Sequence, residues 1–490
     1  MSLTENLRLH ARHRPAKPAI REGGRTIDYA TLDRAIDGLC HELVRRGIAR
    51  GHLVGVGLDD DAEHLITILA LARIGAVLLP VDRRWNRTEK LTVIDRFKAD
   101  KAIMSRHEDG HADDWLVPQP DWFSGSGTPY IDPEVTDASP LLLSLSSGTT
   151  GVPKGPRLTH AQLMNRFMVY WIDIGLNSSD LFVVATPLYF GGGRAFTTGM
   201  LWAGGTIDMF PPPYTAEDLV AHVNTVKGSA IFLVPTLLRR LLAIEQDGLL
   251  FPGLRVLICS GSSLFGNEQL AVRERLTPNL YQYYASTEAG GVSILTPGDF
   301  EGREDSVGRP CFRVEVEVVD DEDRPVLRGK EGRLRYRSPA SPEGYYLGEN
   351  LDAFQGGYFY PGDLALIDAD GYVYLRGRSK DIIIRGGVNI HPGDIEQVLQ
   401  QVPGVVEAAV VAMPSVDHGE EIAAFVVTSR AITQADLIAA CREHLAPYKT
   451  PKMIVFVDTL PRNGIGKVLK KQLQSRLLET QADPVALISG

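Results

Sequence analysis

The sequence predicts an α/β protein with a large N-terminal domain of doubly wound α/β layers that includes a β-rich subdomain, followed by a small α+β C-terminal domain. Before Gly308, short and nearly continuous apolar runs alternate with amphipathic stretches, as in parallel strands that are covered by helices on both faces. From Gly308 the runs become alternating β segments, and after Gly377 a new mixture of strands and helices begins. The predicted domains are therefore residues 1–377 and 378–490.

Length and composition agree with this organisation, because 490 residues with 44% hydrophobic side chains can form two or three cores. The net charge of −10 gives no basic footprint for nucleic acid, and we expect no such partner. The polar start of the chain lacks the apolar core of a signal peptide. The apolar run 65–81 is interrupted by Arg73 and Gly75, which favours a buried helix and strand over a membrane span.

The cysteines are scattered, with neither the spacing of metal ligands nor the density of a disulfide framework. A reducing cytoplasm is the compartment that this pattern predicts, and the sequence leaves the oligomeric state open. The four cysteines are Cys40, Cys259, Cys311 and Cys441.

The predicted strands of the large domain end in loops that could form a binding site. In doubly wound sheets, ligands bind beyond the carboxyl ends of the strands. LICSGSSL, from Leu257, and YQYYASTEAG, from Tyr281, both look like such exits. The predicted strands begin near Leu53, Ala76, Leu181, Ala230 and Leu254.

The stretch SLSSGTTGVPKG, from Ser144 to Gly155, suits a polyphosphate. Its glycines make backbone N–H groups approachable, its hydroxyls are donors, and Lys154 adds a positive charge. It is not an ordinary P-loop, because Lys154 follows Pro153 instead of glycine. Composition alone fits a flexible surface turn equally well. The candidate phosphate-binding residues before Lys154 are Ser146, Ser147, Gly148, Thr149, Thr150 and Gly151.

Five stretches together resemble the adenylate-forming superfamily of acyl-CoA synthetases, non-ribosomal adenylation domains and beetle luciferases, and acyl- or aryl-CoA ligases most of all. The stretches are SSGTTGVPKG, YYASTE, YPGDLA, GRSKDIIIRGGVNIHPGDIE and LPRNGIGKVLK. The resemblance covers nearly the whole chain. It implies that a small-molecule carboxylic acid attacks the α-phosphate of ATP to give an acyl-adenylate and pyrophosphate. Coenzyme A then displaces AMP, and Mg²⁺ is the implied metal.

The resemblance implies two sets of residues around ATP. Thr149, Thr150 and Lys154 would help pyrophosphate to form and leave, Thr287 would donate to the α-phosphate, and Glu288 would bind magnesium. Taken by itself, Glu288 would equally suit a helix N-terminus.

The resemblance also implies the adenine and ribose contacts. Tyr284 would pack against adenine, and Asp363 and Arg378 would bind the ribose. By residue type alone, Tyr284 would be a core side chain, and Asp363 and Arg378 would be solvated. The backbone expected on the other side of the base is that of Ser260, Gly261 and Ser262.

Lys467 resembles the catalytic lysine of the superfamily, and it would offset the two anions that meet in the first step. Because a thiol must later enter where Lys467 stood, the resemblance implies a mobile C-terminal domain that rotates about a hinge at Lys380. Gly386 and Gly387 would let the pantetheine arm of coenzyme A pass close to the backbone. A plain glycine turn between strands explains these two residues equally well.

The predicted acyl pocket contains Tyr189, Phe190, Gly191 and Ala285. Phe190 stands where many relatives have histidine, and Gly191 stands where relatives that activate amino acids have aspartate. An amino acid would therefore bury an unpaired ammonium, which disfavours that class. Ala285 replaces a usual glycine at the pocket floor and favours a small, branched or aryl acid over a long fatty acid. Arg194 could meet a second carboxylate of a substrate, or be solvated or ion-paired.

Two other functions share these motifs. The thiol could be the phosphopantetheine of a carrier protein. The chain could also be a non-catalytic nucleotide-binding descendant, but such a protein would be expected to lack Lys467 or Glu288, and both are present.

His107 and His111 fit the HExxH zinc pattern, but Gly110 inside it argues against the helix that this pattern needs. Pro361 replaces a usual threonine, and no function is assigned to it.

Overall fold

The chain divides into two compact units in a computed structural model. The first unit is Met1–Val316 with Tyr336–Phe359, and the second is Glu317–Arg335 with Tyr360–Gly490. The domain boundary expected near Gly377, where the character of the sequence changes, stays a prediction. The structure describes residues 2–106, 115–125, 127–145, 153–349, 351–415, 417–462 and 468–482.

The larger sheet of the first unit has a parallel centre. Its strand order is β15-β14-β13-β12-β11-β9-β10-β1-β2, and only the pairs at its two ends are antiparallel. The strands are β1 (Pro18–Glu22), β2 (Arg25–Asp28), β9 (Leu181–Val184), β10 (Thr206–Met209), β11 (Ala230–Leu233), β12 (Val256–Cys259), β13 (Leu280–Ser286), β14 (Gly290–Leu295) and β15 (Arg309–Pro310).

The smaller sheet of the first unit has the order β6-β5-β3-β4-β7-β8 and is parallel except at β8. Its strands are β3 (Leu53–Gly57), β4 (Val77–Pro80), β5 (Lys101–Met104), β6 (Trp115–Leu116), β7 (Pro140–Leu143) and β8 (Arg157–Thr159). Strands start within a residue or two of each predicted position in both sheets. The expected doubly wound α/β layers are therefore confirmed.

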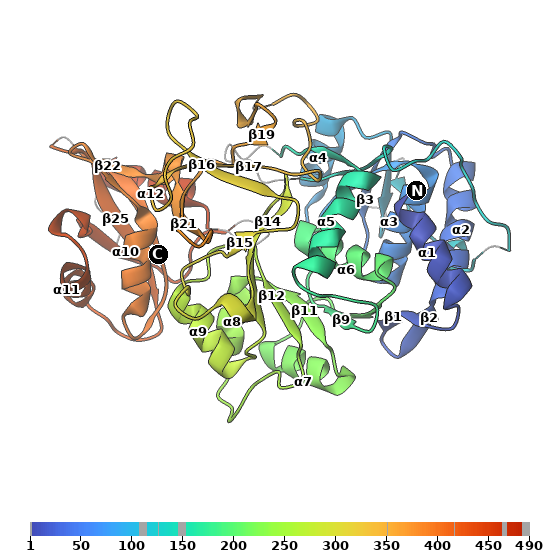
Figure 1. Cartoon of the computed structure of the whole chain (residues 1–490), viewed down its shortest axis with the longest axis horizontal. Helices are drawn as coiled ribbons and strands as arrows, with labels where there is room; N and C mark the ends of the chain where they lie inside the picture. The colour runs from blue at the N-terminus through green and yellow to red at the C-terminus, as the bar shows by residue number, and fades with distance from the viewer. Residues whose placement is uncertain are drawn as a thin grey trace. The chain divides into compact units, whose positions relative to one another are not determined.

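Helices cover both faces of each sheet, which explains why the strands read as continuous apolar runs. On β9, Phe182 and Val184 face one core and Val183 faces another. The first core lies between the sheets and includes α1 (Leu3–His13), α2 (Tyr29–Arg45), α3 (Ala62–Ile74), α5 (His160–Ile172) and α6 (Gly191–Trp202). The outer face of the larger sheet is covered by α7 (Ala216–Val226), α8 (Pro235–Leu242) and α9 (Gly266–Arg275) (Figure 1).

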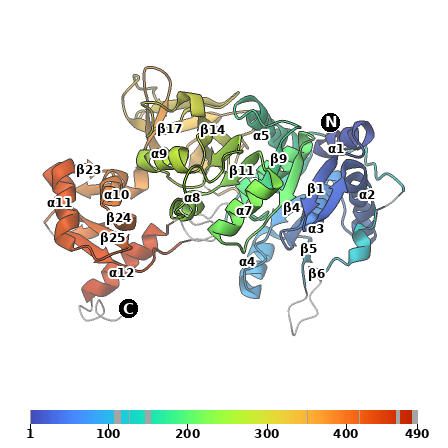
Figure 2. The same cartoon turned by 90° about the horizontal axis from the view of Figure 1, so that it is seen from below.

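The outer face of the smaller sheet packs against α4 (Arg87–Phe97) (Figure 2). The helices begin at polar caps, as the sequence chemistry requires. Thr159 caps α5, because its hydroxyl accepts a hydrogen bond from the backbone N–H of Gln162 at 3.2 Å, and Asp61 caps α3 in the same way. In the described part of the chain, no helix combines the length and the apolar character that a membrane crossing needs.

The predicted β-rich subdomain is present, and the division between the units passes through two of its strands, β16 (Glu315–Val319) and β17 (Gly332–Arg337). In the first unit, β17 pairs with β19 (Tyr358–Phe359), which also pairs with β18 (Phe354–Gln355). In the second unit, β17 pairs with β20 (Asp363–Ile367), which pairs with β21 (Val373–Arg378).

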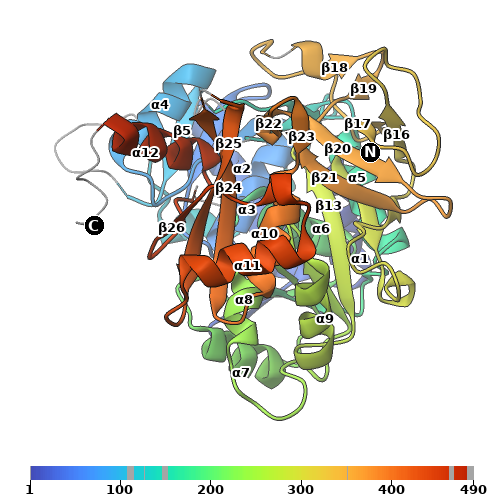
Figure 3. The same cartoon turned by 90° about the vertical axis from the view of Figure 1, so that its left-hand side faces the viewer.

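The rest of the second unit is a mostly antiparallel sheet with helices on both faces, as expected for a small α+β domain (Figure 3). The strand order is β23-β22-β25-β24, and β26 pairs with β25. One core holds α10 (Pro392–Gln401) and α11 (Gln434–His444), and the opposite core holds α12 (Lys470–Ala482). The strands are β22 (Ile383–Arg385), β23 (Val388–Ile390), β24 (Val405–Ser415), β25 (Gly419–Thr428) and β26 (Met453–Phe456).

A buried ion-pair network ties α2 to α3. The Arg73 guanidinium donates to Asp37 at 2.7 Å and to Asp33 at 2.6 Å. Replacing Arg73 with methionine would leave two carboxylates short of their cation, although Arg8 also pairs with Asp37. We predict that Arg73→Met lowers the free energy of unfolding of the first unit by about 3–5 kcal/mol.

Urea unfolding, followed by tryptophan fluorescence, measures this loss. The matched control is Arg25→Met, because Arg25 makes a more exposed pair with Glu63 at 2.8 Å. Its loss should stay below about 1 kcal/mol. Equal losses in the two variants would contradict the role given to the buried network.

Candidate functional site

The carboxyl ends of neighbouring parallel strands meet at one edge of the larger sheet. Leu233 of β11 lies beside Cys259 of β12, which lies beside Gln282 of β13. The residues that follow β12, Ser260 to Ser262, therefore run next to the end of β13. The pairing of β13 with β14 shifts register between Tyr284 and Ala285, at the point where the adenine and acyl contacts were predicted. Both stretches are strand exits, as predicted, because β12 ends at Cys259 and β13 ends at Ser286, and the structure adds that the two strands are neighbours.

Glu288 lies in the turn between β13 and β14, so the alternative of a helix N-terminus is wrong for this residue. Its side chain is only 7% exposed, and its carboxylate accepts a hydrogen bond from the Tyr345 hydroxyl at 2.6 Å. The ammonium of Lys154 lies over the ring of Tyr345, 4.5 Å from the centroid. Tyr345 therefore contacts two of the three predicted catalytic residues that the structure describes in the first unit, Glu288 and Lys154; the third is Thr287, beside Glu288 in the same turn.

Other predicted residues lie outside the described residues. They are Ser146, Ser147, Gly148, Thr149, Thr150 and Gly151 of the phosphate loop, the catalytic Lys467, and the His107 to His111 pattern. Their assignments stay predictions.

The predicted acyl loop is brought against the segment after β12. Phe190 precedes α6, and its ring stacks on Phe232 with centroids 6.1 Å apart. An added Cβ at Gly261 would lie 4.0 Å from the Phe190 ring, so the two predicted contact surfaces are adjacent. Ala285 is half-buried and packs against the same core. Gly191 is exposed at the start of α6.

Tyr189 is held at the edge of this loop. Its hydroxyl accepts a hydrogen bond from Arg84, which also pairs with buried Asp82 at 2.8 Å. Burial and the Asp82 carboxylate raise the pKa of Tyr189 to about 12. Tyr189 is therefore a neutral phenol at physiological pH.

Arg194 is not solvated, because its side chain is only 5% exposed. It donates to the backbone carbonyls of Leu188 at 3.1 Å and Tyr189 at 2.9 Å. Within the described ranges it has no carboxylate within 4.0 Å, so the ion-paired alternative also fails there. Burial and the neighbouring Arg166 lower its pKa to about 10, and it remains charged at neutral pH. Arg194 therefore stabilises the backbone of the acyl loop through the carbonyls of Leu188 and Tyr189.

The second unit holds the predicted ribose residues and hinge. Asp363 is 8% exposed and pairs with the Arg378 guanidinium at 3.1 Å, because β20 and β21 place the two residues opposite each other. The alternative of simple solvation is therefore wrong for Asp363. Lys380 lies in the short helical turn Ser379–Asp381, where partial burial and the charge of Arg378 lower the pKa of its ammonium.

Gly386 and Gly387 form the two-residue turn between β22 and β23. Their φ angles are +57° and +82°, the left-handed values that such a hairpin turn requires and that glycine adopts without strain. The turn explains both glycines by geometry, and their predicted contact with pantetheine stays a prediction.

Sequence reasoning missed two side chains of this site, Tyr345 and Arg166. Arg166 of α5 donates hydrogen bonds to the backbone carbonyls of Thr287 at 3.1 Å and Glu288 at 2.7 Å. Neither residue belongs to a motif that was singled out, and both are far from Glu288 along the chain. Only spatial proximity could have found them.

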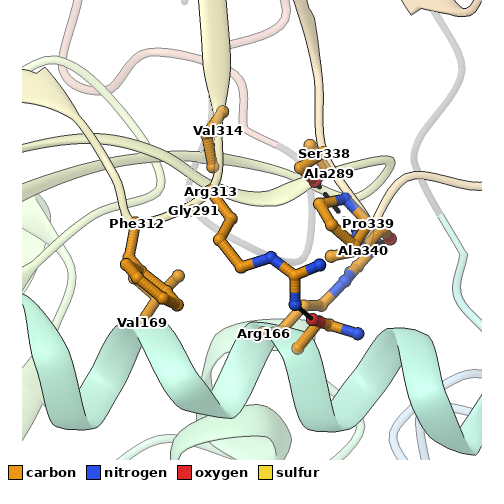
Figure 4. A pocket seen from close by; sticks show the side chains of 11 residues that line it. Arg166, Val169, Ala289, Gly291, Phe312, Arg313, Val314, Ser338, Pro339 and Ala340 are labelled. Atoms are coloured by element: carbon orange, nitrogen blue, oxygen red, sulfur yellow. Dashed lines mark hydrogen bonds between the residues drawn. The ribbon is translucent and has the colours of Figure 1, made fainter.

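A small pocket beside Arg166 is lined by residues of α5, β14 and the 312–314 and 338–340 segments (Figure 4). Arg313 crosses it to donate to Asn165 at 2.9 Å. Its volume of about 10 Å³ is the room of one water molecule, so it is not the substrate cavity. In the residues that the structure describes, no group of three or more His, Cys, Asp or Glu side chains is placed to hold a metal.

Most of the chain is similar to known proteins. Residues 7–346 match the AMP-binding enzyme family, and residues 394–467 match the AMP-binding enzyme C-terminal domain. An indoleacetate–CoA ligase from Aromatoleum aromaticum is 31% identical over 97% of this chain and 98% of its own.

Two solved structures are also similar. ATP-bound MatB from Rhodopseudomonas palustris has a TM-score of 0.87 and 26% identity, over 97% of this chain and 99% of its own. The o-succinylbenzoate coenzyme A synthetase from Bacillus subtilis, in complex with ATP and magnesium ion, has a TM-score of 0.86 and 25% identity, over 96% of this chain and 98% of its own. With a family match over most of its length and a relative of this identity across nearly all of it, the chain belongs to the AMP-binding enzyme family.

Proposed function

We propose that the protein is an ATP-dependent acid–CoA ligase. A carboxylate attacks the α-phosphate of ATP to form an acyl-adenylate with release of pyrophosphate, and the thiol of coenzyme A then displaces AMP. The observation that carries this proposal is the full-length likeness to a CoA ligase, with 31% identity over 97% of the chain. Cytoplasm is the compartment proposed with it, in keeping with four cysteines that are all buried and unpaired.

The nucleotide lies, in this proposal, at the carboxyl edge of the larger sheet. Tyr284 packs against the adenine, with the backbone of Ser260, Gly261 and Ser262 on its other side, and Asp363 and Arg378 bind the ribose. The loop from Ser146 to Lys154 holds the β- and γ-phosphates. Thr287 donates to the α-phosphate, where negative charge develops as the carboxylate attacks.

Glu288 fits a magnesium ion. Mg²⁺ prefers hard oxygen ligands and is usually bound by one or two carboxylates together with phosphate oxygens, so a single buried glutamate is a suitable protein ligand. The metal would neutralise charge on the phosphates. The Tyr345 hydroxyl occupies one carboxylate oxygen and orients the group, and the Lys154 ammonium above the same ring adds positive charge.

An aryl carboxylic acid is the proposed substrate, within the predicted range of small, branched or aryl acids. The supporting observation is the aromatic pair in the acyl loop, in which the Phe190 ring packs on Phe232 with centroids 6.1 Å apart. Gly191, at the start of α6, brings no carboxylate that could pair with an amino acid's ammonium. A carrier-protein phosphopantetheine remains the alternative thiol.

In thioester formation, the thiol of coenzyme A has to enter the position that Lys467 occupied during adenylation. In the proposal, Lys467 stabilises the adenylation step, and residues 378–490 then rotate about Lys380 to admit the thiol past Gly386 and Gly387. Lys467 lies three residues before α12, within the stretch matched by the C-terminal family domain.

The function is tested by a screen of pyrophosphate release. Arylacetic and hydroxycinnamic acids should release pyrophosphate from ATP, and α-amino acids and long-chain fatty acids should give little. The accepted acid is then supplied with coenzyme A or with a phosphopantetheinylated carrier protein. We expect a CoA thioester. Release with amino acids alone, or thioester on the carrier alone, would reject the proposal.

Tyr345 gives a sharper test of the site. Tyr345→Phe removes the hydroxyl that donates to Glu288 and keeps the ring beneath Lys154. A hydrogen bond to a charged group contributes about 1.5–3 kcal/mol, so ATP–pyrophosphate exchange should slow by about 10-fold or more. The matched control is Tyr358→Phe, whose hydroxyl donates to Glu315 in the same unit and should be dispensable for exchange. Equal rates of ATP–pyrophosphate exchange in the two variants would show that the Tyr345 hydroxyl has no special role in adenylation.

Lys467 is tested by separating the half-reactions. Lys467→Ala should abolish ATP–pyrophosphate exchange, because the cation that offsets the two meeting anions is lost. Thioester formation from supplied acyl-adenylate should continue. Lys330→Ala is the control, since Lys330, like Lys467, follows a glycine in the sequence, and its own side chain is exposed. The assignment fails if both half-reactions of Lys467→Ala fall together.

A further inference from the structure

Arg166 is a buried cation that the sequence motifs do not include. It lies on α5, two turns after the Thr159 cap, and is 6% exposed. Its guanidinium donates to three backbone carbonyls: Thr287 at 3.1 Å, Glu288 at 2.7 Å and Ala340 at 3.3 Å. One side chain therefore connects the turn after β13 to the 338–341 segment.

The turn packs directly on the Arg166 side chain. Gly290, at the end of this turn, has φ +75°, and a Cβ added there would lie 2.8 Å from both Cγ and Cδ of Arg166. Because no larger residue fits without moving the arginine, the turn and Arg166 are in contact along the side chain as well as at the guanidinium. The backbone of Thr287 and Glu288 is therefore held by the Arg166 guanidinium, and the end of the same turn packs on the rest of the arginine side chain.

Burying the charge of Arg166 destabilises the folded protein, because the guanidinium loses its hydration. Burial lowers its pKa, and the charge of the nearby Glu288 opposes this effect without cancelling it. A well-packed apolar side chain usually stabilises such a position at least as well as a buried charge. Packing alone therefore does not explain an arginine here. The planar guanidinium explains the choice of arginine, because it can donate to carbonyls of two segments at once. A lysine ammonium has no such planar arrangement of donors.

The 336–359 segment reaches Glu288 by a second route. Ala340 accepts from Arg166, which also holds the Glu288 carbonyl, and Tyr345 donates to the Glu288 carboxylate at 2.6 Å. Arg166 thus controls the backbone of Glu288 while Tyr345 controls its side chain. Both contacts therefore link Glu288 to the 336–359 segment, one through its backbone and one through its carboxylate. Figure 4 shows Arg166 close to Ala340, whose carbonyl accepts a hydrogen bond from it.

We infer that Arg166 is a positioning residue for the adenylation step, which sets the turn of Thr287 and Glu288 and so aims the α-phosphate donor and the magnesium ligand. This inference rests on the proposed function. Arg166 touches backbone carbonyls and not the reacting atoms, so it acts through the turn. A shift of about 1 Å in a positioned group can cost about 10²-fold in rate.

The test compares Arg166→Met and Arg166→Lys with Arg73→Met and Arg73→Lys in the full-length protein. Arg73 is the matched control, because it is an equally buried arginine on a helix of the same unit and pairs with Asp33 and Asp37. Three quantities are measured: the thermal midpoint, kcat and KM for ATP–pyrophosphate exchange, and the affinity for ATP with Mg²⁺ and with EDTA.

Arg166→Met should lower kcat by about 10²-fold with a smaller change in KM, since the turn is misplaced in the transition state. The gain in ATP affinity that Mg²⁺ provides should shrink, and the affinity in EDTA should be kept. Arg166→Lys, which retains charge and length, should fold and show a smaller loss of the same kind. The Arg73 variants should lose thermal stability and keep kcat and the effect of Mg²⁺.

Three results would overturn the inference. They are an unchanged kcat and Mg²⁺ effect in both Arg166 variants, a loss of ATP affinity that is the same with Mg²⁺ and with EDTA, and an equal kcat loss in the Arg73 variants. Failure of the proposed function looks different, because the parent would then show no exchange with any acid. The effect of Mg²⁺ on ATP affinity would still decide the role of Arg166.

Discussion

A carboxylate removed from water needs partners that compensate its charge, and the buried Glu288 carboxylate imposes this constraint on the first unit. The hydroxyl of Tyr345 and the backbone contacts of Arg166 come from segments far apart in the chain, and both have to arrive at one turn. The parallel sheet makes this possible, since it ends β12 and β13 at the same edge and leaves the turn beyond them. The layers around the sheet hold that edge in place.

Local cations, and not the net charge, suit this edge to an anionic ligand. The chain carries a net charge of −10, yet Lys154, Arg166 and Arg194 all lie in the first unit around the predicted nucleotide and acyl residues. Arg166 and Arg194 are buried and hold backbone carbonyls, so they shape the site through its loops. Lys154 stands over an aromatic ring, where its charge can reach a ligand. In a site that excludes water, a few such charges act strongly.

The fold was largely predictable because its signals are local. The apolar runs that begin near Leu53 and Leu181 became buried strands, since a strand covered on both faces must be apolar at every position. The exits after Cys259 and Ser286 were predictable for the same reason. Side-chain environments were less so. Glu288 was open to a helix N-terminus and lies in a hairpin turn, and Arg194 was open to solvation and is buried.

The sequence by itself determined the order of the strands and helices, the motifs that mark an AMP-binding enzyme, and the identity of the residues proposed to meet ATP. These features depend on residues that are neighbours along the chain. Only the tertiary structure decided that Tyr345 reaches the Glu288 carboxylate and that Arg166 holds the same turn together with Ala340. Such contacts join residues separated by many positions, and they form only when the sheet edge and the segments that cross it are packed together, so no local pattern encodes them.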